Sequence, residues 1–156
     1  MNRSAFSPSV SVVEDVGLAD EEAPLRILLA EDDREMRRLL SLVLHRDGHE
    51  VVETRDAGEL LEALASTLIE PGPRPFDLIV CEQSLPGIPG LTVLAGLRSR
   101  GCSTPFILIT GDEAVGEHAR RLDGIVLDHP FNIEAIRLAI RRCFPPGEAE
   151  RRRAGG

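Results

Sequence analysis

Five short apolar runs alternate along the chain with longer segments of helical periodicity, and no other feature constrains the fold as much. The runs cover residues 26–30, 50–53, 77–81, 106–109 and 124–127. Apolar residues between and after them recur at intervals of three and four, the spacing of a helix that buries one face. Strands that alternate with helices form a parallel sheet with helices on both sides. The sequence therefore predicts a doubly wound α/β fold of five βα units.

The helices between these runs are defined by their apolar faces. The first is predicted to bury Met36, Leu39, Leu40, Val43 and Leu44 and to end at Asp47-Gly48. The second is predicted to bury Leu60, Leu61, Leu64, Ala65 and Leu68. The third is marked by Leu91, Leu94 and Leu97, and residues 112–122 predict a short fourth helix. Asn132 is a good N-cap for the last helix, in which Ile133, Ile136, Ile140 and Cys143 are expected to face inward.

The composition of the two ends differs from that of the middle. Residues 1–24 are rich in Ser, Glu, Asp and Ala, and predict a disordered N-terminal arm. Residues 145–156 open with Pro-Pro and close with Gly-Gly, and predict a flexible C-terminal tail. Residues 25–144 then form one domain, and too few residues follow for another. We expect a stand-alone domain.

Charge and apolar content exclude several classes of function. The 18 basic and 26 acidic residues give a net charge of −8, which argues against binding the phosphate backbone of nucleic acids. No apolar run approaches the roughly 20 residues that span a bilayer, so we expect no membrane partner. The three cysteines are widely spaced and odd in number, as in a protein of a reducing compartment. A cytoplasmic location is therefore expected.

The residues just past the predicted strands are the candidate functional residues, because ligands of open α/β sheets bind at the carboxyl ends of the strands. They include Glu31, Asp32, Glu82, Thr110 and His129. Carboxylates that meet at one point require a cation or a protonated partner, which Mg²⁺ or His129 could supply. Consecutive acids after the first strand exclude a flavodoxin-like phosphate loop, and the absence of Lys excludes a P-loop.

Four segments in this order resemble the receiver domain of bacterial two-component response regulators. They are residues 27–33, 76–91, 107–111 and 127–131, which together lie within residues 25–144. The resemblance implies a flavodoxin-like (βα)₅ fold with strand order 2-1-3-4-5. It also assigns Glu31 and Asp32 to the acidic pocket and Thr110 to the position of the switch hydroxyl.

Three positions depart from the pattern of that family. Glu82 stands where the resemblance places the aspartate that accepts a phosphoryl group from a histidine kinase. His129 stands at the position of the lysine that clamps the acyl phosphate, and Val126 at that of the aromatic switch residue. Glu is one methylene longer than Asp, and a shift near 1 Å can cost on the order of a hundredfold in rate. His is shorter than Lys and titrates near neutrality.

These departures lead to a main hypothesis and two alternatives. The main one is a stand-alone pseudo-receiver, not an enzyme, that works through protein–protein contacts in signal transduction without a cofactor. One alternative is a receiver that still accepts a phosphoryl group on a noncognate carboxylate, with Mg²⁺ held weakly by Asp32 and Glu82. The other is a small-molecule binder, for which no donor-rich pocket is evident. The sequence names neither the partner nor the pathway, and does not decide whether Glu82 mimics a phosphorylated state.

The predicted working surface is the face made by the fourth helix, fifth strand and fifth helix. It is expected to carry Arg120, Arg121, Arg137, Arg141 and Arg142, away from the acidic cleft. Clustered arginines on a chain of negative net charge would steer an acidic protein partner. In receivers this face also forms homodimers, so a homodimer is the alternative use of this surface.

Overall fold

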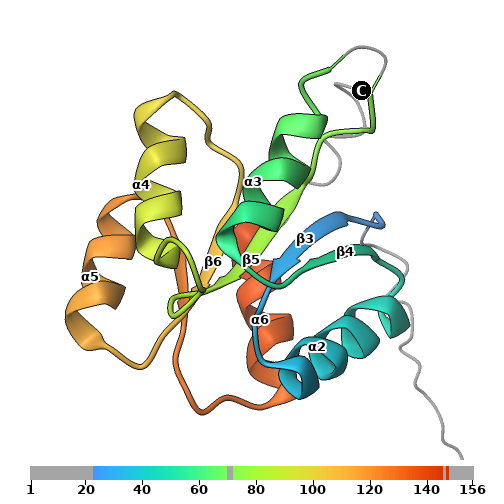
Figure 1. Ribbon diagram of the computed structural model, residues 1–156. Helices are drawn as coiled ribbons and strands as arrows, with labels where there is room; N and C mark the ends of the chain where they lie inside the picture. Colours follow the sequence, from blue (N-terminus) through green and yellow to red (C-terminus); the bar gives the residue numbers. More distant parts are fainter. Residues whose placement is uncertain (1–22, 70–71, 146, 148–156) are drawn as a thin grey trace, which may run out of the picture. The chain divides into compact units, whose positions relative to one another are not determined.

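The computed structural model describes residues 23–69, 72–145 and 147. Its strands are β3 (Arg26–Ala30), β4 (Glu50–Thr54), β5 (Leu78–Glu82), β6 (Phe106–Ile109) and β7 (Ile125–Leu127). Its helices are α2 (Arg34–Arg46), α3 (Ala57–Ser66), α4 (Gly90–Ser99), α5 (Glu113–Arg121) and α6 (Ile133–Cys143). Strands and helices alternate throughout, as predicted (Figure 1).

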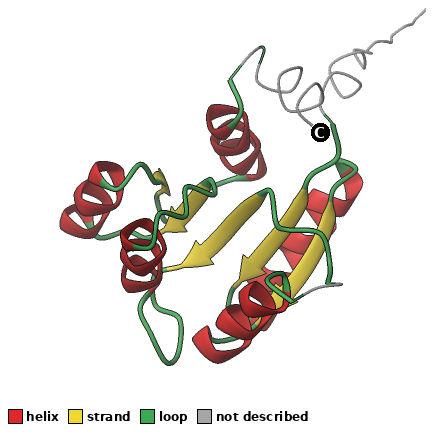
Figure 2. Ribbon diagram, turned by 90° about the horizontal axis from the view of Figure 1, so that it is seen from above, coloured by secondary structure: helices red, strands yellow, loops and turns green. Residues whose placement is uncertain are grey.

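The five strands form one parallel sheet in the order β4-β3-β5-β6-β7. In chain order this is 2-1-3-4-5, so the predicted flavodoxin-like (βα)₅ fold is confirmed. The inner strands β5 and β6 are buried along their whole length, which explains why they read as continuous apolar runs. Figure 2 shows the sheet with helices on both of its sides.

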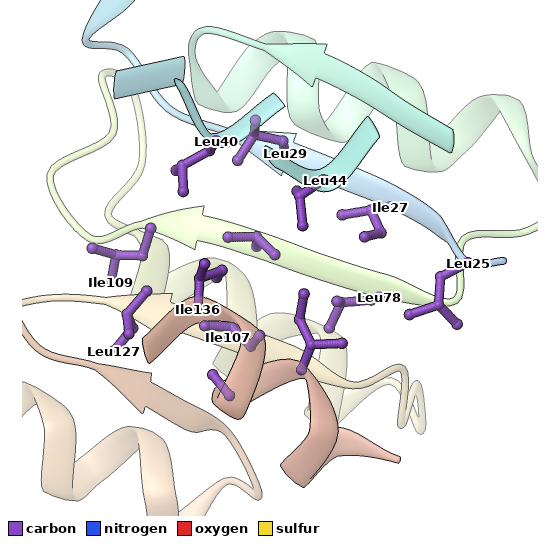
Figure 3. Packing of buried hydrophobic residues seen from close by; sticks show 13 residues of the cluster. Leu25, Ile27, Leu29, Leu40, Leu44, Leu78, Ile107, Ile109, Leu127 and Ile136 are labelled. Atoms are coloured by element: carbon purple, nitrogen blue, oxygen red, sulfur yellow. The ribbon is translucent and has the colours of Figure 1, made fainter. Parts of the chain in front are cut away.

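Each face of the sheet packs its own core. On one face α2 and α6 cover the strands, with Leu29, Leu78 and Ile107 at the centre of the cluster (Figure 3). On the other face α3, α4 and α5 cover Leu28, Ile79 and other residues of the intervening positions. Each buried Leu or Ile side chain contributes about 1.5–3 kcal/mol relative to leaving it exposed. The alternation along each strand therefore decides which helices can dock on which side.

Side-chain caps begin four of the five helices of the described residues. Asp33, Asp56, Asp112 and Asn132 each accept a hydrogen bond from the backbone amide three residues later, at 2.8–3.1 Å. Such a cap is worth about 1 kcal/mol, and the prediction for Asn132 is confirmed. Two of the acids that follow strands, Asp33 and Asp112, thus serve the helices and not the strand-end cluster.

Five predicted core positions are wrong, because Leu39, Leu61, Ala65, Leu68 and Ile133 are exposed. Leu68 is 82% exposed, because α3 ends at Ser66 and Leu68 lies beyond its C-cap. Ile133 is 40% exposed, because the first turn of α6 faces a groove between α2 and α6 that no third helix covers. Helical periodicity identified the helices but gave no information on where each helix leaves the sheet.

The predicted arm at residues 1–24 and the predicted tail at residues 145–156 fall almost entirely outside the described residues, so both remain predictions. Within the described ranges, no helix combines the length and the apolar character needed to cross a bilayer.

Candidate functional site

The candidate site lies at the carboxyl edge of the sheet, where β3, β5, β6 and β7 end side by side. Glu31 follows β3 directly, Glu82 is the last residue of β5, and Thr110 follows β6. Strand register fixes their relative positions: Ala30 pairs with Cys81, and Glu82 with Ile109. Residues from four distant segments therefore meet because the strands that carry them are neighbours.

Glu82 is almost fully buried, at 8% exposure, and both of its carboxylate oxygens have protein partners. One oxygen lies 3.0 Å from Nε2 of His129, and the other accepts a hydrogen bond from the backbone amide of Ser84 at 3.2 Å. His129 is 40% exposed at its side chain, and its ring lies 5.6 Å from that of Phe131. Hydrogen-bond partners on both oxygens stabilise the negative charge of the carboxylate, which lowers its reactivity as a nucleophile.

Glu31 is the second buried carboxyl group, with 2% exposure. One oxygen accepts from the amide of Asp33 at 3.0 Å, whereas Oε1 has no hydrogen-bond partner. Burial, together with the negative charges of Glu82 and Asp32, raises the pKa of Glu31 to about 7. Near neutral pH this carboxyl group can therefore bind a proton, which relieves repulsion among the three acids.

Asp32 contrasts with its neighbour because its side chain is exposed. The backbone carbonyls of Glu31 and Asp32 accept hydrogen bonds from Arg37, at 2.7 and 3.3 Å, so the loop is held while the Asp32 carboxylate faces solvent. Among the described residues, no group of three or more His, Cys, Asp or Glu side chains is arranged to hold a metal ion. Mg²⁺ usually binds one or two carboxylates and keeps several waters, so its weak binding by Asp32 and Glu82 stays a prediction.

Thr110 and Val126 occupy different surroundings. Thr110 is buried, and its hydroxyl oxygen accepts a hydrogen bond from the amide of Asp112 at 3.0 Å, which fixes the entry to α5. Its carbonyl accepts from the amide of His129 at 3.4 Å, so it joins the ends of β6 and β7. Val126 is half-buried and belongs to the core on the α3, α4 and α5 side. A branched aliphatic side chain there has no ring that could swing between two positions.

The loop after β5 positions Glu82, and sequence reasoning missed how it does so. The amides of Gly90 and Leu91 donate to the backbone and side-chain oxygens of Gln83, at 2.9 and 2.8 Å. A Cβ atom at Gly90 would lie 2.8 Å from the carbonyl oxygen of Glu82, so only glycine fits there. The Pro- and Gly-rich composition of residues 86–90 signalled a turn, but not this close approach.

The predicted arginine face is only partly formed. Arg120 and Arg142 are exposed and take part in none of the ion pairs of the described residues, and Arg121 pairs loosely with Glu117 at 3.7 Å. Arg137 instead binds Asp47 at the end of α2 through two hydrogen bonds of 2.9 and 3.1 Å. Arg141, one turn after Arg137, lies on the same side of α6. Arg137 thus joins two elements of the fold, and its place in the predicted arginine face stays a prediction.

Comparison with known proteins gives consistent matches. A family model for the response regulator receiver domain matches residues 27–141. Response regulator MprA of Mycolicibacterium vanbaalenii is 33% identical over 129 residues, which cover 78% of this chain and 53% of that protein. Its counterpart in Mycobacterium avium is 33% identical over 133 residues, covering 81% and 55%. The chain thus spans about half the length of these relatives.

Solved structures match over most of the domain. The signal receiver domain of an HD domain-containing protein from Pseudomonas fluorescens Pf-5 has a TM-score of 0.67 at 27% identity, covering 94% of this chain and 99% of that one. Chemotaxis protein CheY4 of Vibrio cholerae has a TM-score of 0.65 at 22% identity, covering 78% and 99%. Because its identity is only 22%, the match to CheY4 supports the fold alone.

Proposed function

This chain belongs to the response regulator receiver family of signal transduction, and we propose that it acts there as a pseudo-receiver, a module that binds other proteins without accepting a phosphoryl group. The observation that carries the proposal is the engagement of Glu82. Its two oxygens are held by His129 and by the amide of Ser84, which fixes the carboxylate and stabilises its charge, and so lowers its reactivity toward a phosphodonor. On this proposal the domain is not an enzyme.

Two further features support the loss of phosphoryl transfer. The partner of Glu82 is an imidazole and not a permanently charged amine, so it is an unreliable clamp for a phosphoryl group. Glu31, with its pKa raised to about 7, can bind a proton and so relieve the repulsion among the three acids without a metal ion. Asp32 and Glu82 could then bind Mg²⁺ only weakly. The residues at the acceptor, clamp and metal-binding positions thus all differ from the family pattern in ways that disfavour phosphoryl transfer.

The proposed working surface is what remains of the predicted arginine face. Arg120 and Arg142 extend from α5 and α6, the two helices that flank β7, with Arg121 beside them. Arg binds carboxylates in a planar, bidentate geometry and is enriched at interface hot spots. These positions favour a protein partner with an acidic surface. Capture of such a partner should depend on Arg120 and Arg142 and should change little in Glu82→Gln.

The test of the main proposal is phosphorylation of the purified chain by a small phosphodonor such as acetyl phosphate in the presence of Mg²⁺. Intact-mass spectrometry should detect no adduct on the wild type. The matched variant combines Glu82→Asp with His129→Lys and restores the acceptor and clamp of the family, so we expect it to gain a phosphoryl adduct. An adduct on the wild type that disappears in Glu82→Gln would instead establish the alternative, a receiver that uses a noncognate carboxylate.

A further inference from the structure

The two faces of the sheet are covered unequally. Three helices pack on one face, whereas only α2 and α6 pack on the other. α2 lies over β4 and β3, and α6 lies over β7 and β6, so a groove of about 430 Å³ remains between the two helices. Its apolar lining includes Met36, Leu39, Leu40, Val43, Phe131, Ile133 and Ile136.

Apolar side chains continue from this groove onto the outer surface of α2. Leu39 is 45% exposed and Leu42 is 57% exposed. The spacing of Glu35, Leu39, Leu42 and Arg46 is i, i+4, i+7 and i+11, which places all four on one stripe of the helix. We call these four residues the α2 stripe. Its two ends are charged with opposite signs and its centre is apolar.

The charges at the ends of the α2 stripe are not used within the fold. Glu35 and Arg46 are both exposed, and neither appears in an ion pair or side-chain hydrogen bond of the described part of the chain. Leu39 and Leu42 likewise lie outside both core clusters. Exposed leucines cost roughly 25 cal/mol for each Å² of apolar surface that water must cover. The stripe therefore has both the apolar centre and the free charges of a binding surface.

We propose that the α2 stripe pairs two copies of the chain around a two-fold axis, with the two α2 helices antiparallel. The stripe is symmetric about the point midway between Leu39 and Leu42. A two-fold axis through that point places Leu39 against Leu42 of the second copy, and Glu35 against Arg46 of the second copy. Such a self-complementary patch is what an isologous dimer requires.

The charges at the two ends of the α2 stripe favour antiparallel over parallel pairing of the two helices. A parallel pairing would place Glu35 against Glu35 and Arg46 against Arg46, and like charges in contact are destabilising. α6 shows the same order of residue types, with Glu134, Leu138 and Arg141 at i, i+4 and i+7, and Leu138 is 47% exposed. Glu134, however, is already paired with Arg137 at 2.9 Å, so α6 does not carry the two free end charges that the α2 stripe has. The interface uses α2, and differs from the arginine face on α5 and α6.

The experiment is sedimentation velocity of the full chain over a range of concentrations. The wild type should show a concentration-dependent dimer, and Leu42→Glu should raise its dissociation constant by at least about tenfold because it places a charge at the centre. Leu61→Glu is the matched control: Leu61 is 41% exposed but lies on α3, so its variant should dimerise like the wild type. Circular dichroism melts of all variants establish that each one is folded.

Charge exchange tests the antiparallel register. Glu35→Arg and Arg46→Glu should each weaken the dimer, and the double variant should restore it, because the symmetry brings the exchanged charges together again. A chain that remains monomeric at millimolar concentration would overturn the proposal. A dimer that survives Leu42→Glu would also overturn the proposal. If that dimer is lost in Arg142→Glu, self-association belongs to the arginine face.

Discussion

Strand β5 contains two kinds of buried residue. Its first four residues, from Leu78 to Cys81, are apolar and fully buried, and they pack into the two cores. Its last residue, Glu82, is nearly as buried but needs His129 and a backbone amide to satisfy its carboxylate. Burial in the sheet interior stabilises the fold, because it removes apolar surface from water.

Burial at the carboxyl edge of the sheet destabilises the fold. Glu31 and Glu82 lose hydration there, and Glu31 leaves one oxygen without any partner. A buried polar atom without a partner costs about 1–3 kcal/mol. This edge is therefore maintained at a cost to stability, whereas the interior of the sheet stabilises the fold.

Truncation of a residue in the sheet interior should have the largest effect on stability. Ile79→Ala removes a fully buried side chain from the centre of the sheet, and should lower the free energy of unfolding by about 3 kcal/mol. Urea denaturation followed by circular dichroism measures this loss. Glu82→Gln, at the end of the same strand, keeps the size of the side chain and should cost less than about 1 kcal/mol. Equal losses of unfolding free energy in Ile79→Ala and Glu82→Gln would contradict the distinction between the sheet interior and its carboxyl edge.

The stability of the folded chain should depend on pH through the carboxyl group of Glu31. The carboxyl group has an ordinary pKa of 4.5 and a pKa of about 7 in the folded chain. Between these values the unfolded chain has lost the proton while the folded chain retains it, so stability should fall as the pH rises and level off above about pH 7.

Glu31→Gln removes this titration and should stabilise the chain at pH 8 by roughly 2–3 kcal/mol relative to the wild type. At pH 4, where the wild-type carboxyl group is neutral in both states, the two proteins should unfold at similar denaturant concentrations. The measurement is a series of urea titrations from pH 4 to pH 8. A difference that is the same at every pH would mean that burial does not hold the proton on Glu31.

The smallest effect is expected at His129. His129→Ala removes the partner of one Glu82 oxygen, but water can reach the vacated position because the ring is 40% exposed. We therefore expect a loss of about 1 kcal/mol in thermal or chemical denaturation. Asp128→Ala is the control, since Asp128 is exposed and makes none of the hydrogen bonds of the described residues, and it should change stability by less than about 0.5 kcal/mol. A loss no larger than that of the control would show that the pair contributes nothing to stability.

Much of the architecture could be predicted because its signals are local. Apolar runs predicted β3 and β6 with the bounds that the structure has, and Asn132 was predicted as a cap from its residue type and position alone. Helix ends were harder: α3 stops before Leu68, although the apolar spacing continues through that residue. Periodicity reports which face of a helix is apolar, whereas the end of the helix depends on its contact with the sheet.

The order of the elements and the residue types that reach the carboxyl edge follow from the sequence, because strand and helix patterns depend on neighbours in the chain. Which of those residues become partners depends on the tertiary structure. Glu82 and His129 are 47 positions apart, and Asp47 and Arg137 are 90 apart. Distances across such separations depend on strand register, helix orientation and side-chain rotamers, none of which is a local property. The pKa of Glu31 likewise depends on how much water the whole fold excludes around it.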